Sequence, residues 1–64
     1  MNTVQKEILV TETGEAVIQL LQNDRRVTIG NIVDLLEGKR HAASGERAEH
    51  LRAVLVFIRK KAVL

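Results

Sequence analysis

The sequence has no cysteine, proline, tryptophan or tyrosine, and Phe57 is its only aromatic residue. Without cysteine no disulfide can form, and no thiol is present to act as a nucleophile. The scarcity of aromatic residues, with no long alternation of apolar and polar positions, argues against a sheet protein. No apolar run approaches the ~20 residues that a membrane span requires. These absences favour a small helical protein, which we expect to be cytoplasmic because its N-terminus lacks the layout of a secretory signal.

Size is the next constraint. The chain has 64 residues, and a domain this small buries only about 60% of its unfolded surface. Such domains usually rely on disulfides, a metal or a partner chain. His41 and His50 are the only histidines, whereas a structural zinc site needs about four ligands. We therefore expect no metal or other cofactor, and a homodimer as the stabilising arrangement.

The last third of the chain carries the strongest pattern. Apolar residues recur there at the helical spacings 3, 4, 3 and 4, at Ala48, Leu51, Leu55, Ile58 and Ala62. The run 54–58 is wholly apolar, so it covers more than one side of a helix. We expect a core and dimer interface formed by Leu51, Val54, Leu55, Phe57 and Ile58. Alternatively, the run is simply the buried core of a monomer.

Capping signals divide the chain into three predicted helices. The first covers about residues 11–22, with Thr13 as a cap. The second follows Thr28 as N-cap and ends before Gly38 as the C′ residue. Ser44, the only serine, caps the third, which runs to about residue 61.

The predicted fold is all-α: three short helices in one domain, residues 11–64, completed by dimerisation through the C-terminal helix. Residues 1–10 form an arm, whose segment 4–10 is expected to extend the first helix, to form a short strand or to remain loose. The first helix is expected to present the face Val10, Gly14, Val17 and Leu21, and the second Ile29, Ile32, Val33 and Leu36.

Charge is distributed unevenly. Residues 1–24 carry one Lys and four acidic residues (−3), whereas residues 25–64 carry nine Lys or Arg against four acidic residues (+5). Acidic residues near helix starts and basic residues near helix ends account for most of this pattern. The basic residues that could contact DNA or a protein partner are Arg25, Arg26, Lys39, Arg40, Arg59, Lys60 and Lys61.

Catalysis finds little support in the sequence. Ser44 is expected to cap a helix, which accounts for it without a catalytic role. His50 beside Glu49 is typical of a solvated surface pair. The glycines are scattered and do not form a phosphate-binding loop. We expect no enzyme activity and no small-molecule substrate.

DNA binding is the main alternative function. Residues 28–58 can be interpreted as a helix-turn-helix. However, the connection of about six predicted residues exceeds the usual 3–4, and Glu46 and Glu49 at the start of the recognition helix would repel phosphates. Weak, nonspecific binding is the more credible form of this alternative. An antitoxin-like protein that binds a toxin is a third interpretation.

Three segments resemble a known family: 13–21 (TGEAVIQLL), 27–36 (VTIGNIVDLL) and 51–58 (LRAVLVFI). They are similar to the small enterobacterial biofilm-development proteins, also called two-component-system connector proteins, which feed into a phosphorelay. The resemblance covers residues 11–60. It implies a helical homodimer without enzyme activity, acting as an adaptor in signalling to biofilm, acid-stress or capsule genes. The implied partner is a response regulator or related signalling protein, and nonspecific DNA association is compatible with it.

Overall fold

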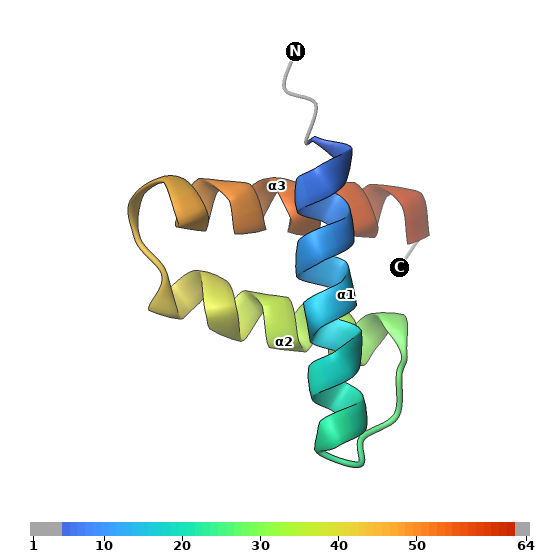
Figure 1. Ribbon diagram of the computed structural model, residues 1–64. Helices are drawn as coiled ribbons and strands as arrows, with labels where there is room; N and C mark the ends of the chain where they lie inside the picture. The colour runs from blue at the N-terminus through green and yellow to red at the C-terminus, as the bar shows by residue number, and fades with distance from the viewer. Residues whose placement is uncertain (1–4, 63–64) are drawn as a thin grey trace.

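The computed structural model describes residues 5–62, which form three α-helices and no strand. They are α1 (Lys6–Gln22), α2 (Ile29–Ala42) and α3 (Gly45–Ala62). In Figure 1, α2 and α3 lie side by side in opposite directions, and α1 crosses both of them on one face. The predicted all-α class with three helices is therefore confirmed.

Helix α1 begins earlier than predicted. It starts at Lys6, and Thr13 lies inside it, so the prediction of Thr13 as its cap is wrong. Gln5 is the N-cap residue and makes no side-chain capping bond. The added first turns are held by packing, because Ile8 and Leu9 lie against the core. Residues 6–10 thus extend the helix, whereas positions 1–4 of the expected arm and 63–64 of the expected domain lie outside the described residues.

The end of α1 is closed by a Schellman motif. Asp24 has a φ of 55°, the left-handed conformation that Asp adopts more readily than most residues. The amide of Arg25 donates to the carbonyl of Leu20 at 2.9 Å, and that of Asp24 donates to Leu21 at 3.1 Å. These two bonds satisfy carbonyl groups that the helix end leaves without partners.

Helix α2 starts as predicted. The hydroxyl of Thr28 accepts a 3.0 Å hydrogen bond from the amide of Asn31, which confirms Thr28 as the N-cap. The side-chain amide of Asn31 also donates to the carbonyl of Arg26 at 2.8 Å. Both bonds fix the connection from α1 to the start of α2.

The predicted end of α2 at Gly38 is wrong, because the helix continues to Ala42. Gly38 does not have the positive φ that a C′ glycine adopts. Ion pairs on either side of it hold the extra turn: Arg40 bonds Glu37 three residues earlier, and Lys39 reaches Glu15 of α1. The connection to α3 therefore shrinks to Ala43 and Ser44.

Helix α3 begins at Gly45, whose φ of 61° lies in the left-handed region. Within residues 5–62, the hydroxyl of Ser44 makes no capping hydrogen bond to the first turn, contrary to prediction. A left-handed residue directly after Ser44 turns the chain before the regular helix starts, so the hydroxyl is not held in N-cap geometry.

The three helices share one apolar core. Its side chains are at most 7% exposed and come from every helix: Ala16, Leu20, Ile32, Val33, Leu36, Leu51, Val54 and Leu55. On α2 the predicted face is buried except for Ile29, which is 41% exposed at the first turn. Small Ala16, at 0% exposure, lets α1 approach the layer formed by α2 and α3.

Candidate interaction surfaces

The residues predicted to form both core and dimer interface are divided by the structure. Leu51, Val54 and Leu55 lie in the core of the single chain. Ile58 is partly buried against it, and Phe57 remains 39% exposed. Since the core members contact α1 and α2 of their own chain, they are not available to a second subunit. Of the predicted set, Phe57 alone has substantial surface left for a partner.

The apolar face predicted for α1, flanked by Ile18 and Leu20, is buried only in part, at Val17 and Leu20. Val10 and Leu21 are 62% and 60% exposed, whereas Ala16 and Leu20 are buried. The buried row also contains Glu12, four residues before Ala16 and 6% exposed. A mainly aliphatic row thus lies away from the core, and a row containing a carboxylate and an alanine faces it.

We call the row of α1 that lies away from Ala16 and Leu20 the outer seam. It consists of Val10, Gly14, Val17 and Leu21, with Ile18 beside it. Val17 is half-buried at the edge of the core, and Ile18 is 56% exposed. The spacings 4, 3 and 4 along the seam are those of a coiled-coil contact row. This feature of α1 has no packing role inside the described chain apart from Val17.

Ion pairs fix the opposite edge of α1. The guanidinium of Arg47 at the start of α3 donates to Glu12 at 3.3 Å, and the ammonium of Lys39 on α2 lies 3.8 Å from Glu15. Both partners belong to the α2–α3 turn region. The outer seam therefore faces away from that turn, about 100–180° around the helix from these carboxylates at 100° per residue.

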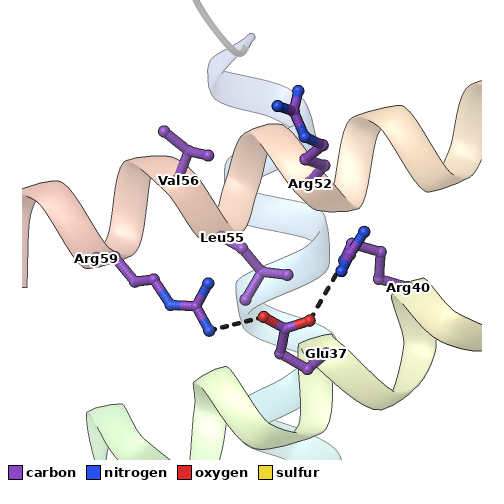
Figure 2. Close-up of a pocket in the computed structure, with 6 residues that line it drawn as sticks. All are labelled: Glu37, Arg40, Arg52, Leu55, Val56 and Arg59. Carbon is purple, nitrogen blue, oxygen red and sulfur yellow. Dashed lines mark hydrogen bonds and ion pairs between the residues drawn. The ribbon is translucent and has the colours of Figure 1, made fainter.

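A second surface lies between α2 and α3, where Glu37 accepts hydrogen bonds from two arginines (Figure 2). Arg59 donates at 2.6 Å and Arg40 at 3.3 Å. The hydrogen bond from Arg59 and then that from Arg40 hold the pKa of the Glu37 carboxyl below its usual 4.5. Two of the predicted contact residues are thus engaged in an internal network that joins α2 to α3.

A shallow cavity of about 150 Å³ adjoins this network. Its lining adds Arg52, Leu55 and Val56, and the side chains of Arg52 and Val56 point away from Glu37 (Figure 2). The lining carries three arginines and one carboxylate, so the cavity is positive and could accept an anion. A wider depression of about 290 Å³ lies at the turn, lined by Lys39, Ala42, Ala43 and Arg47.

The other predicted basic residues lie apart from this cluster. Arg25 and Arg26 are exposed in the connection between α1 and α2. Lys60 and Lys61 are exposed at the end of α3, where the Lys61 ammonium lies 6.0 Å from the centre of the Phe57 ring. The structure therefore brings Arg40 and Arg59 together and leaves the remaining basic residues in separate parts of the surface.

Sequence reasoning missed the acidic partners. It assigned Glu12 only to the charge of a helix start and gave Glu37 no role, although each holds an ion pair between helices. A signal for Glu12 exists in its spacing, since it shares the row of Ala16 and Leu20. Nothing in the local sequence pairs Glu37 with Arg59, because the two residues meet only through packing of α2 on α3.

Within residues 5–62, no group of three or more His, Cys, Asp or Glu side chains is placed to hold a metal ion. In the same part of the chain, no helix combines the length and apolarity needed to cross a membrane. Comparison with known proteins finds no family model, no curated protein and no solved structure that matches the chain.

Proposed function

We propose that the protein is a non-enzymatic regulatory adaptor that acts by protein–protein contact in the cytoplasm. One observation carries the proposal: this small domain leaves large apolar side chains exposed on all three helices and in the connection between α1 and α2. They are Val10, Ile18, Leu21, Val27, Ile29, Val56 and Phe57, each at least 39% exposed. Apolar surface of this kind, when contiguous, marks sites of protein association.

The signalling role is proposed from the family resemblance. The resembling segments include the Gly14 region of α1 and the apolar residues of α3. In this proposal the protein is a connector that modulates two-component signalling linked to biofilm formation or acid stress. Its partner is a response regulator or related signalling protein, and the protein works as a homodimer.

The test is capture of partners from an enterobacterial lysate with the tagged full chain, at moderate salt and with nuclease added. A response regulator or its kinase, recovered with the unchanged chain, supports the proposal. The matched variants are Ile18→Glu and Glu46→Gln: the first alters the apolar surface, and the second an exposed carboxylate. If Ile18→Glu recovers as much of the signalling protein as the unchanged chain, a role for that apolar surface is contradicted. If no signalling protein is recovered, the connector role is contradicted.

Nonspecific DNA binding is the second candidate, favoured by exposed Arg25, Arg26, Lys60 and Lys61. The helix-turn-helix form receives no support, because such helices cross at about 90–120°, whereas α2 and α3 lie side by side (Figure 1). Binding to labelled duplex DNA should then be independent of sequence and fall steeply with salt. Replacing Lys60 and Lys61 by Gln should reduce both the affinity and the salt dependence. Capture of a signalling protein that survives nuclease would favour the adaptor instead.

A further inference from the structure

We propose that the cavity between α2 and α3 binds a phosphate monoester group through the guanidinium groups of Arg40, Arg52 and Arg59. The same chemistry is presented by free phosphate, by a small phosphate ester and by a phosphorylated side chain of another protein. This inference goes beyond the adaptor function and does not depend on it, because the cavity lies within a single chain and needs no signalling partner.

The two arginines beside Glu37 keep most of their hydrogen-bond donors. A guanidinium carries five N–H groups, and Arg59 contacts Glu37 only through Nη2, whereas Arg40 contacts it only through Nε. The two arginines bind different oxygens of the carboxylate, so Glu37 anchors both side chains at the edge of the cavity (Figure 2). Their other N–H groups are therefore positioned beside the cavity and available to an anion.

Arg52 supplies a third cation that is not engaged in the network. It lines the same cavity from α3, is exposed, and points away from Glu37 (Figure 2). Within residues 5–62 it forms no ion pair. Because its guanidinium is held by no carboxylate there, Arg52 can turn toward a bound anion without breaking an ion pair.

Charge indicates the type of anion. The lining carries three arginines and one glutamate, and Glu37 is ionised at neutral pH because Arg59 and Arg40 lower the pKa of its carboxyl. The cavity therefore has a net charge of +2. A phosphate monoester carries about −1.5 to −2 at neutral pH, whereas a carboxylate or a phosphodiester of DNA carries a single charge. Of these groups, the monoester neutralises the cavity most completely.

The cavity has the size and walls that suit a small charged group. Its volume of about 150 Å³ lies below the ~300–1,000 Å³ of pockets that enclose whole small molecules. Leu55, which is 2% exposed, and Val56 give it an apolar side. Apolar walls reduce the screening of charges by water and so strengthen charge-assisted hydrogen bonds. A phosphoryl group can thus enter while the rest of its molecule stays in solvent.

The first test titrates the full chain with methyl phosphate and with dimethyl phosphate at neutral pH and constant ionic strength. Nitrogen-15 NMR of the arginine Nε–H groups follows the binding. Methyl phosphate should shift the signals of Arg40, Arg52 and Arg59 until they saturate. Dimethyl phosphate, with one charge fewer, should bind at least about tenfold more weakly. Equal affinities would overturn the monoester assignment, and the absence of saturable shifts would overturn the site.

The second test removes the uncommitted arginine. Arg52→Gln should raise the dissociation constant of methyl phosphate about tenfold, because a charge-assisted hydrogen bond is lost. The matched control is Lys60→Gln, which removes the same charge from α3 at a residue outside the cavity lining. It should change the constant less than about twofold, since exposed distant charges are screened. Equal weakening by both variants would mean that general positive charge attracts phosphate, and would overturn the site. Circular dichroism checks that both variants keep their helices.

The source of the phosphoryl group is decided by a third titration, with a phosphoserine flanked on each side by two alanines. If this peptide binds at least as tightly as methyl phosphate, the site accepts a phosphorylated side chain. If it binds at least about tenfold more weakly, the site takes free phosphate or a small ester. Peptide binding that Arg52→Gln leaves unchanged would overturn the assignment to this cavity. Failure of the site in these titrations would not bear on the adaptor function, which the capture experiment tests separately.

Discussion

The carboxylate of Glu37 accepts a 2.6 Å hydrogen bond from Nη2 of Arg59, joining α2 to α3. A second, 3.3 Å bond from Nε of Arg40 reaches the other carboxylate oxygen from within α2. One partly exposed acid thus connects the helices that pack side by side.

This contact predicts how stability depends on pH. The pKa of Glu37 is lowered from 4.5 by Arg59 and then Arg40. A lowered folded-state pKa means that the contribution is present above the unfolded pKa and is lost as pH falls through the lower, folded value. The melting temperature of Glu37→Gln should therefore lie below that of the unchanged chain near neutral pH, and the difference should shrink under acid conditions.

Thermal melts from neutral to strongly acid pH measure this difference. Glu46→Gln is the matched control, because the Glu46 side chain is 87% exposed and its partner His50 is 3.9 Å away. A Glu37→Gln difference that stays constant down to the lowest pH would contradict the assigned role of the ionised carboxylate.

Glu12 and Arg47 form one ion pair, but substitutions of the two residues should differ in their effect on the free energy of unfolding. The Glu12 side chain is 9% exposed and that of Arg47 is 54% exposed, at a separation of 3.3 Å. Arg47→Ala should destabilise the fold by about 1–2 kcal/mol, because it leaves a buried carboxylate without its charged partner. Glu12→Leu should be neutral or stabilising, since it replaces a buried charge by apolar packing. Urea unfolding measures both, and a large loss in Glu12→Leu would count against this view.

Alanine substitutions at two glycines should change the stability of the fold in opposite directions. Gly38 lies inside α2, and a Cβ added to it would meet no atom within 4 Å, so Gly38→Ala should stabilise by about 0.5–1 kcal/mol. Gly45 has a φ of 61°, so Gly45→Ala should destabilise by about 1–2 kcal/mol. Denaturant midpoints of the two variants test this, and stabilisation by Gly45→Ala would mean that the left-handed start of α3 is not needed.

Aspartate substitutions at Phe57 and Leu55 should differ in how far they destabilise the fold, although the two residues are close in sequence. Leu55 is 2% exposed, so Leu55→Asp buries a charge and should unfold a domain of this size. Phe57 is 39% exposed, so Phe57→Asp should retain its helices with a smaller loss of stability. Circular dichroism with thermal melts compares them. Unfolding by Phe57→Asp to the same extent would show that the ring contributes to the core.

The candidate surfaces could be predicted only in part. Exposed basic residues such as Arg25 and Lys60 follow from charge and position in the chain. The pairing of Glu37 with Arg59 does not, because it joins residues 22 apart on two helices. The outer seam is visible in the sequence as an apolar row, but periodicity alone predicts that this row lies inside the molecule.

The three helices, the Thr28 cap and the apolar residues 51, 54 and 55 of α3 could be predicted without the structure, because they depend on local periodicity and hydrogen bonding. Tertiary structure alone decided which side of α1 is buried. That helix has two rows that could face the core, and the row with Ala16 packs there, where Arg47 of α3 pairs with Glu12. The aliphatic row is left outside, since three helices of this length enclose only one face of α1.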